Sequence, residues 1–181
     1  MRQQRGFSLI ELLIVISIIL IIAAIAIPNL LSARRAANES SAVGSLRTIN
    51  TAEVSMQTAR GVSTCNLNDL GPAANGGLGY LDELLARAMG PPPCVAAKSG
   101  YCFTPGVFAG TCTPSVLVVP APPAAPMSSY SWGADPTAPG TSGINAWCTD
   151  QPAVIYRDAT AAPGAPGTSA ACAAANPLVP L

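Results

Sequence analysis

The six cysteines are the residues of this sequence that most readily indicate a specific chemistry. They are spread over the C-terminal two thirds of the chain with no CxxC pair: Cys65, Cys94, Cys102, Cys112, Cys148 and Cys172. An even number of separated cysteines is typical of disulfides formed in an oxidising compartment. The chain has no histidine, the commonest general base and a frequent zinc ligand. We therefore predict three disulfides in an exported domain, and no catalytic residue, metal site or cofactor.

The pairing of the six cysteines is open, because fifteen arrangements are possible. We expect sequential pairing: Cys65 with Cys94, Cys102 with Cys112, and Cys148 with Cys172. Cys102 and Cys112 could flank one hairpin turn, and Cys172 could tie an otherwise coreless tail to a strand at Cys148. Each closed loop would stabilise the domain by about 2 to 4 kcal/mol.

Three aspartates raise the alternative of a calcium site. Asp135, Asp150 and Asp158 could converge near the edge of a sheet. They lack the D-x-D-x-D spacing of a calcium-binding loop, so we interpret them as solvated turn residues.

Glu11 is a carboxylate inside an apolar segment. From Phe7 to Ile27, the other polar residues are Ser8 and Ser17. As a helix rising ~1.5 Å per residue, this segment is roughly 30 Å long, the thickness of one hydrocarbon core. An unpaired carboxylate in hydrocarbon costs several kcal/mol, so Glu11 indicates a specific polar partner unless it snorkels to the interface.

Two arginines, Arg2 and Arg5, precede the apolar segment. Positive charge on this side favours a cytoplasmic N-terminus with the rest of the chain translocated. The alternative is a secretory signal peptide cleaved after Ala24-Ile25-Ala26, which would give a soluble protein beginning at Ile27. Against that alternative, Glu11 interrupts the apolar segment and the helical pattern continues past Pro28 without a linker.

The helical pattern beyond Pro28 places apolar residues three and four apart, at Val43, Leu46, Ile49, Ala52 and Met56. We assign the polar residues between them to the opposite face: Arg35, Glu39, Ser45, Asn50 and Glu53. This periodicity predicts one nearly continuous helix from Phe7 to about Arg60, ended by Gly61. Pro28 should kink it or unwind it locally around residues 24–27.

After Gly61 the composition shifts to Gly, Pro, Ala, Ser and Thr. A three-turn helix is expected at residues 81–88, and short strands at 98–103, 115–119, 128–133, 144–149 and 153–157. The stretch 120–126 is typical of a polyproline loop, and residues 159–181 have little to bury. The predicted fold class is α+β, with a long N-terminal helix, transmembrane in one half and amphipathic in the other, packed on a small antiparallel sheet.

The run Gly6-Phe7-Ser8-Leu9-Ile10-Glu11-Leu12-Leu13 resembles the signature of type IV pilins and of the related pseudopilins of type II secretion. The resemblance implies that a prepilin peptidase cleaves between Gly6 and Phe7 and that Phe7 is methylated. It also implies that Glu11 bonds the terminal amine of a neighbouring subunit. The resemblance covers Met1 to about Arg60, and residues 130–156 look like the last strands of bacterial pilin heads.

The chain departs from the family pattern at two places. Leu20 stands where many members have a glycine, so melting of the helix during assembly depends mainly on Pro28. The stretch 104–126 is richer in proline than a minimal head. By this resemblance the chain divides into a leader at 1–6, a transmembrane and assembly helix at 7–28, an amphipathic half at 29–60 and a disulfide-containing head at 61–181.

The resemblance implies a filament subunit that is first a bacterial inner-membrane precursor and then part of an extracellular pilus for adhesion, motility or surface contact. Its partners would be other copies of itself in a helical homopolymer, the prepilin peptidase, the inner-membrane assembly machinery and the membrane. The alternatives are a type II secretion pseudopilin and a minor tip pilin whose head is a binding module. The net charge is zero and basic residues cluster only in the leader, so nucleic-acid binding is not expected.

Overall fold

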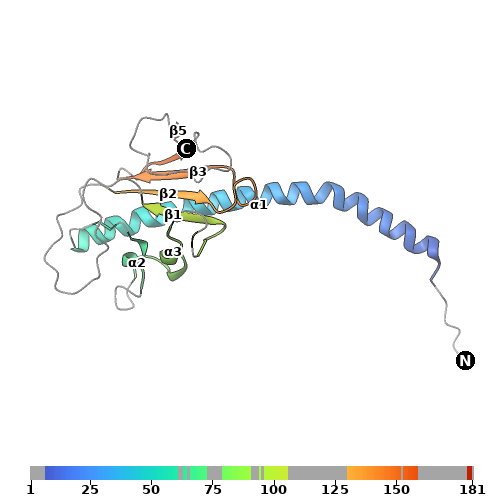
Figure 1. Ribbon diagram of the computed structural model, residues 1–181, viewed down its shortest axis with the longest axis horizontal. Helices are drawn as coiled ribbons and strands as arrows, with labels where there is room; N and C mark the ends of the chain where they lie inside the picture. The colour runs from blue at the N-terminus through green and yellow to red at the C-terminus, as the bar shows by residue number, and fades with distance from the viewer. Residues whose placement is uncertain are drawn as a thin grey trace, which may run out of the picture. The chain divides into compact units, whose positions relative to one another are not determined.

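The computed structural model describes residues 7–60, 63–64, 66–72, 79–90, 94, 96–105, 130–151, 153–158 and 179–180. The chain forms two compact units, Met1–Arg34 and Arg35–Leu181. One helix, α1 (Leu9–Arg60), contributes residues to both units, as predicted (Figure 1).

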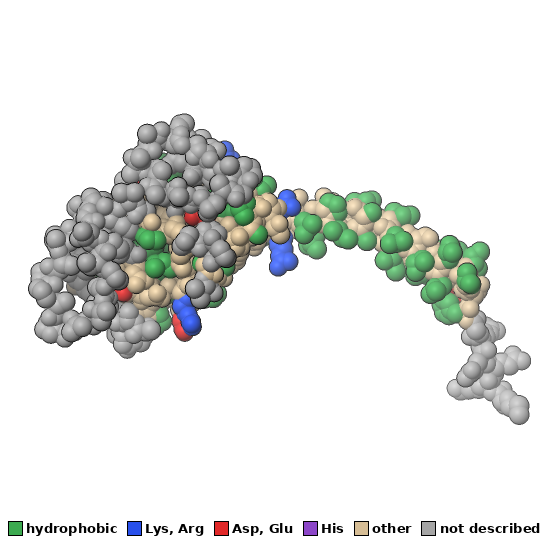
Figure 2. All heavy atoms as spheres, in the orientation of Figure 1, with side chains coloured by type: hydrophobic (Ala, Val, Ile, Leu, Met, Phe, Trp, Pro, Cys, Tyr) green, Lys and Arg blue, Asp and Glu red, His purple; other side chains and the backbone are tan. Residues whose placement is uncertain are grey.

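The first unit contains the apolar part of α1. Its large side chains are exposed from Phe7 to Leu31, and Figure 2 shows apolar side chains along this stretch. By length and composition, the helix could cross a membrane. We expected a kink or local unwinding around residues 24–27; the helix continues through Pro28 without a break, so the unwinding is not observed. A proline removes one backbone donor, and the hydrogen bonds of the neighbouring turns are enough to continue the helix.

In the second unit, α1 runs along the sheet (Figure 1) and buries the predicted apolar face. Leu46, Ile49, Ala52 and Met56 are buried, Val43 is partly buried, and Ala42 joins them. The helix packs against aromatic side chains from the strands: Tyr101, Phe103, Tyr130, Trp132 and Trp147. Apolar burial of this kind contributes about 25 cal/mol per Å², so these contacts are the main source of the head's stability.

The polar face was predicted wrongly. Asn50 and Glu53 were expected opposite the core, yet both are buried. Each has a hydrogen-bonding partner in the head: Asn50 bonds Thr149, and Glu53 bonds Trp132. Side-chain periodicity cannot distinguish such paired polar groups from solvated ones, because it records polarity and not partners.

The sheet is an antiparallel meander in the order β1-β2-β3-β4-β5. Its strands are β1 (Tyr101–Pro105), β2 (Ser131–Pro136), β3 (Ala146–Asp150), β4 (Ile155–Asp158) and β5 (Val179–Pro180). The register pairs Phe103 with Ala134 and Gly133 with Cys148. The fold class is therefore α+β, as predicted. The strand β5 was not expected in the low-complexity tail, and the predicted strand at 115–119 lies outside the described residues.

Two short helices lie between α1 and the sheet in the sequence. Helix α2 (Leu67–Leu70) was not predicted, and α3 (Glu83–Arg87) is shorter than the expected three turns. Asp82 caps α3 by accepting from the backbone N–H of Leu85. The helix ends early because Met89 pairs with Phe103 in a β-bridge, which draws the chain into extended structure.

Candidate functional site

The start of α1 carries Phe7 and Glu11. Phe7 precedes the helix and is exposed, and Gly6 lies outside the described residues. The carbonyl of Ser8 accepts from the backbone N–H groups of Glu11 (3.1 Å) and Leu12 (3.3 Å), which closes the first turn. Glu11 stands in that turn, where a carboxylate is favoured by the helix dipole.

Glu11 is exposed and its side chain has no hydrogen bond or ion pair among the described residues. The nearby large side chains are apolar and exposed, including Leu9, Ile10, Leu12 and Leu13. This surface can bury itself only against lipid or against another apolar chain. A carboxylate on such a surface can bind a cation delivered by a partner.

A second group of polar residues anchors α1 in the head. The Glu39 carboxylate accepts from the backbone N–H groups of Ile144 (2.8 Å) and Asn145 (3.2 Å) and from Asn145 Nδ2 (2.8 Å). One helical position before it, Asn38 donates to the carbonyl of Ser142 (2.8 Å). The loop between β2 and β3 is therefore held to α1 by four hydrogen bonds.

The same loop covers Tyr101. The Tyr101 hydroxyl donates to the carbonyl of Asn145 (2.9 Å), and its ring occupies the place of any side chain at Gly143. Burial, followed by the charge of Glu39, raises the pKa of Tyr101. Only glycine fits at position 143 without displacing the tyrosine.

Glu53 is the most deeply buried carboxylate on α1. Its two oxygens accept from the backbone N–H of Thr64 (3.1 Å) and from Trp132 Nε1 (3.0 Å). The Thr64 hydroxyl in turn donates to Asp69 (2.8 Å). Burial is the main reason that the Glu53 pKa rises to about 7, and the nearby charge of Asp69 adds to it. This network ties α1, α2 and β2 together.

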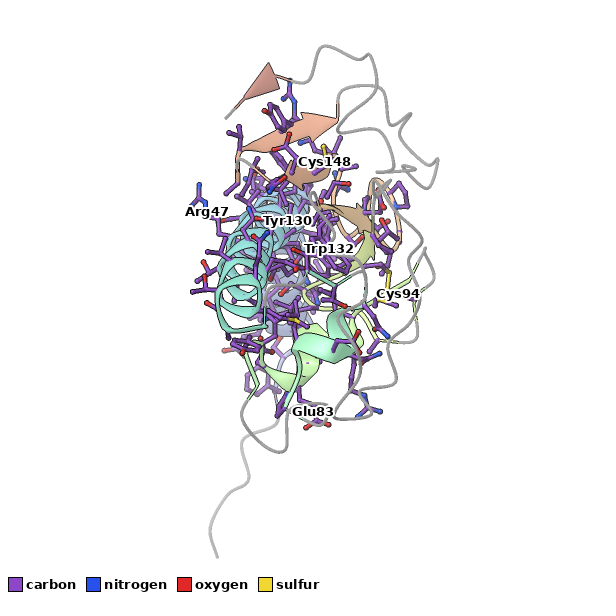
Figure 3. The ribbon with its side chains drawn as sticks, turned by 90° about the vertical axis from the view of Figure 1, so that its left-hand side faces the viewer. Arg47, Glu83, Cys94, Tyr130, Trp132 and Cys148 are labelled. Atoms are coloured by element: carbon purple, nitrogen blue, oxygen red, sulfur yellow. A yellow bond between two sulfur atoms is a disulfide. The ribbon has the colours of Figure 1, made fainter. Side chains whose placement is uncertain are left out.

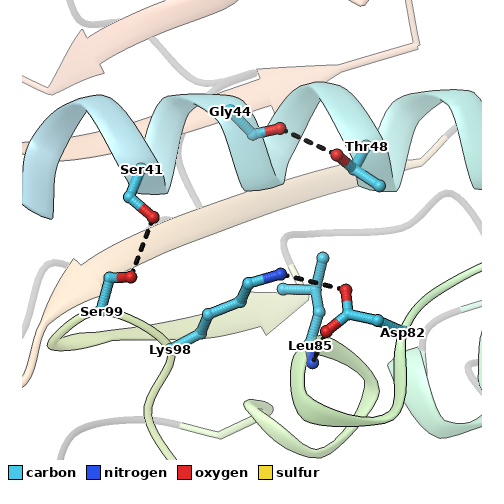
Figure 4. Close-up of polar contacts among 7 residues, drawn as sticks. All are labelled: Ser41, Gly44, Thr48, Asp82, Leu85, Lys98 and Ser99. Atoms are coloured by element: carbon cyan, nitrogen blue, oxygen red, sulfur yellow. Dashed lines mark hydrogen bonds and ion pairs between the residues drawn. The ribbon is translucent and has the colours of Figure 1, made fainter.

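Asn50 forms a chain of hydrogen bonds with β3. Its Nδ2 donates to the Thr149 hydroxyl (2.8 Å), which donates to the carbonyl of Val154 (2.9 Å). Further along the head, the Ser41 hydroxyl donates to that of Ser99, and Lys98 pairs with Asp82 (Figure 4). Glu39, Asn50 and Glu53, which we call the polar anchors, thus hold α1 to the head at three levels. Sequence reasoning assigned all three to the solvent side.

The disulfide arrangement differs from the prediction. Cys94 is bonded to Cys102, with their Cα atoms 5.8 Å apart. The expected pairs Cys65 with Cys94 and Cys102 with Cys112 are therefore wrong. The reason is a tight reversal of the chain at the antiparallel bridge between Lys98 and Tyr101, which lies between the two cysteines.

Cys148 on β3 is also disulfide-bonded, and no described cysteine is free. Its expected partner, Cys172, lies outside the described residues, as do Cys65 and Cys112. The pairing of Cys148 therefore stays a prediction.

The three aspartates of the possible calcium site are kept apart by the strand register. Asp150 pairs with Ser131 at the start of β2, whereas Asp135 lies near the end of that strand opposite Cys102. Asp158 pairs with Ala146, at the other end of β3 from Asp150. Within the described part of the chain, no three potential metal ligands gather.

Comparison with known proteins bears on the N-terminal segment. Residues 1–27 match the family described as the prokaryotic N-terminal methylation motif. The chain is 67% identical over 39 residues to the type IV wide pilus major component PilA4 of Thermus thermophilus, which is 22% of this chain and 30% of that protein. It is 38% identical over 86 residues to the type IV major pilin protein PilA of Myxococcus xanthus, covering 48% of this chain and 39% of that one.

The chain thus matches well under half the length of either relative. The resemblance to type IV pilins drawn from Gly6 to Leu13 is confirmed by these matches. Both relatives are described as major pilus components, not as enzymes.

Proposed function

We propose that this chain is a structural subunit of a type IV pilus, cleaved by a prepilin peptidase between Gly6 and Phe7, methylated at Phe7, and polymerised through α1. The observation that carries the proposal is the position of the motif. The methylation motif at residues 1–27 coincides with the part of α1 whose apolar side chains are exposed. An apolar helix of this length needs lipid before assembly and a protein partner after it.

The two relatives favour an abundant filament subunit over the alternatives. Both are named as major pilus components, one in Thermus thermophilus and one in Myxococcus xanthus. A type II secretion pseudopilin or a minor tip pilin would use the same N-terminal motif, so the motif alone does not separate the three functions. The proposed location is the bacterial inner membrane for the precursor and the extracellular filament for the mature subunit, delivered by the inner-membrane assembly machinery.

Glu11 and the amine of Phe7 would link cleavage to polymerisation. Before cleavage, the carboxylate lies only about 6 Å along the helix from Phe7, close enough for headgroups to reach it. In a dry filament core those headgroups and water are gone. Removing one partner of a buried ion pair costs ~3 to 5 kcal/mol, so each subunit would need the amine that cleavage creates on a neighbour. Pro28 is the other α1 residue assigned to assembly, as the place where the helix could adjust.

Replacing Glu11 tests the proposed pair. Glu11→Ala should give processed, membrane-resident monomers and few or no filaments, because nothing attracts the incoming amine. Glu11→Asp, shorter by one methylene, should assemble in part. Ser17→Ala is the matched control in the same segment, since the Ser17 hydroxyl already donates to the carbonyl of Leu13 (2.7 Å). Fractionation and electron microscopy measure both steps, and abundant normal filaments from Glu11→Ala would refute the role of Glu11.

Mass spectrometry of sheared surface filaments tests the function itself. We expect this chain to be among the dominant proteins, beginning with methylated Phe7. A mature protein beginning at Ile27 would instead indicate a secreted soluble domain. Loss of secreted enzymes after deletion would favour the pseudopilin, and a few copies confined to the tip would favour the minor pilin.

A further inference from the structure

A shallow pocket lies on α1 beside the turn between β3 and β4. The residues that line it come from one side of the helix and from that turn: Arg47, Asn50, Thr51, Val54, Ser55 and Ala153. We call this the α1 pocket. It lies wholly within the second unit; among its helical residues Arg47, Thr51 and Val54 are exposed, whereas Asn50 is buried.

The α1 pocket presents apolar surface around one unpaired cation. The hydroxyls of Thr51 and Ser55 donate to carbonyls one turn back, at Arg47 (3.0 Å) and Thr51 (2.7 Å). Their hydrogen-bonding capacity as donors is therefore used inside the helix. Val54 is 50% exposed, and Arg47 is exposed and in no ion pair among the described residues. An occupant should accordingly offer an apolar side chain next to a carboxylate.

The start of α3 offers that pair of side chains. Leu84 is 54% exposed, one of the few large apolar residues exposed in the described part of the head. Glu83 precedes it and bonds Arg87 in a solvent-exposed i,i+4 pair (3.3 Å). Such a pair is weak, so an incoming arginine can share the carboxylate. The neighbouring Asp82 is less available, because its oxygens bind Lys98 and the backbone N–H of Leu85.

The two surfaces lie on different sides of the head. Figure 3 shows Arg47 projecting from α1 on one side and Glu83 projecting from α3 at another edge. One copy can therefore use its pocket for one neighbour and its α3 for a second. A contact between unlike surfaces is heterologous, and when its rotation does not close a ring it generates an open helical filament.

We propose that Glu83 and Leu84 of one copy dock into the α1 pocket of a neighbouring copy, with Glu83 facing Arg47 and Leu84 facing Val54. This inference rests on the proposed function, since it describes a contact between heads in the polymer. It adds a contact in the head to the one proposed between Glu11 and Phe7. The charged side chains beside the docked pair on its own copy are Asp82, Lys98 and Arg87. Asp82 and Lys98 pair with each other (3.0 Å), and Arg87 pairs with Glu83 itself (3.3 Å).

Charge reversal tests the contact in whole cells. Arg47→Glu and Glu83→Arg should each lower the yield of sheared filaments by about tenfold or more, because like charges would meet across the contact. Coexpressing the two single variants should restore the yield, since each variant pocket then finds an α3 of opposite charge. Arg157→Glu, the same change at an exposed arginine on β4, is the matched control and should assemble normally.

Three outcomes separate the possibilities. Normal filaments from both single variants, or no recovery on coexpression, would overturn the contact while leaving the proposed function intact. A wild-type chain that never enters filaments would overturn the proposed function instead. If a reversal unfolds the head, as near-UV circular dichroism would report, Arg47→Gln and Glu83→Gln replace it. Each should lower the yield at low salt, and unchanged yield would again overturn the contact.

Discussion

The two stretches of α1 belong to one unbroken helix and face different surroundings. From residue 9 to residue 31 its large apolar side chains are exposed, and Glu11 has no partner in the described residues. From residue 35 to residue 60 the helix buries Leu46, Ile49 and Met56, and the polar anchors hydrogen-bond the head. In the proposed filament, a membrane and then other subunits would cover the first stretch, whereas the second is covered by the head of its own chain.

The difference shows that a stretch of this chain can be helical without burying side chains in the head's core. Both stretches are helical, yet among the described residues only the second buries side chains in the hydrophobic core. Mutations in the first stretch should therefore change assembly and leave the head's stability alone. Mutations at the buried positions of the second stretch should lower the head's stability.

The largest effect on stability is expected from replacing Leu46, with the same replacement at Leu20 as the comparison. Leu46→Ala removes a fully buried side chain and should lower the free energy of unfolding by about 2 to 5 kcal/mol, through lost burial and a cavity. Leu20→Ala, in the exposed stretch, should leave it within about 0.5 kcal/mol. Urea unfolding of the full chain in detergent, followed by tryptophan fluorescence, measures both. Equal losses would show that the two stretches are not independent.

The next effect is a pH dependence from Glu53. Burial raises its pKa from an ordinary value of 4.5 to about 7 in the folded head, so folding favours the protonated form. This stabilisation is fully present below about pH 4.5 and is lost as pH rises through 7, a change of about 3 kcal/mol. The head should thus be more easily unfolded at pH 8 than at pH 5.

Glu53→Gln isolates that contribution from other titrating groups. The variant cannot titrate, so the difference between its unfolding free energy and that of the wild type should vary between pH 5 and 8. Glu53→Gln should also be less stable than the wild type at low pH. Its amide N–H₂ would face one of the two N–H groups that donate to the Glu53 carboxyl group. A difference that stays constant with pH would place the Glu53 pKa near its ordinary value.

A smaller effect is expected at Glu39. Glu39→Ala leaves three N–H donors of Ile144 and Asn145 without their acceptor and should cost about 1 to 3 kcal/mol. Hydrogen exchange should report faster exchange at those two backbone amides. Ser40→Ala, at the adjacent exposed position, is the control and should leave their exchange unchanged.

The smallest effect is expected at Glu83. Glu83→Gln breaks an exposed pair with Arg87 and should change the free energy of unfolding by at most about 0.5 kcal/mol. The same variant should still reduce filament yield if Glu83 docks on a neighbour. A large loss of stability in urea unfolding would mean that Glu83 supports the head and not the contact between copies.

The sequence predicted well whatever depends on periodicity. The apolar positions 46, 49, 52 and 56 gave the buried face of α1, and alternating residues located β3 and β4 to within about two residues. A four-residue helix such as α2 has no such period, and α3 ends early because Met89, just beyond it, pairs with Phe103 of β1. The candidate site was predicted from the motif at Gly6 to Glu11, where residue types alone carry the signal.

The remaining features depend on partners distant in sequence. Glu53 and Trp132 are 79 residues apart, and no local sequence pattern predicts the hydrogen bond between them. The Cys94 to Cys102 bond required knowledge of the reversal between them, and the separation of Asp135 from Asp150 required the strand register. One local signal for such a buried polar residue is usable: a glutamate or asparagine that lies next to the apolar stripe of an amphipathic helix.

The spacing of the polar anchors along α1 has a mechanical consequence. Glu39 and Glu53 are separated by roughly 21 Å of helix, and Asn50 lies between them. A pull along the helix axis would load all three attachments in shear at the same time, because they are spaced one after another along the same helix. Rupture would then require several hydrogen bonds and the apolar contacts to fail together, whereas a sideways pull would break them one after another. The contact between the head and α1 should therefore resist tension along the helix axis better than a sideways pull.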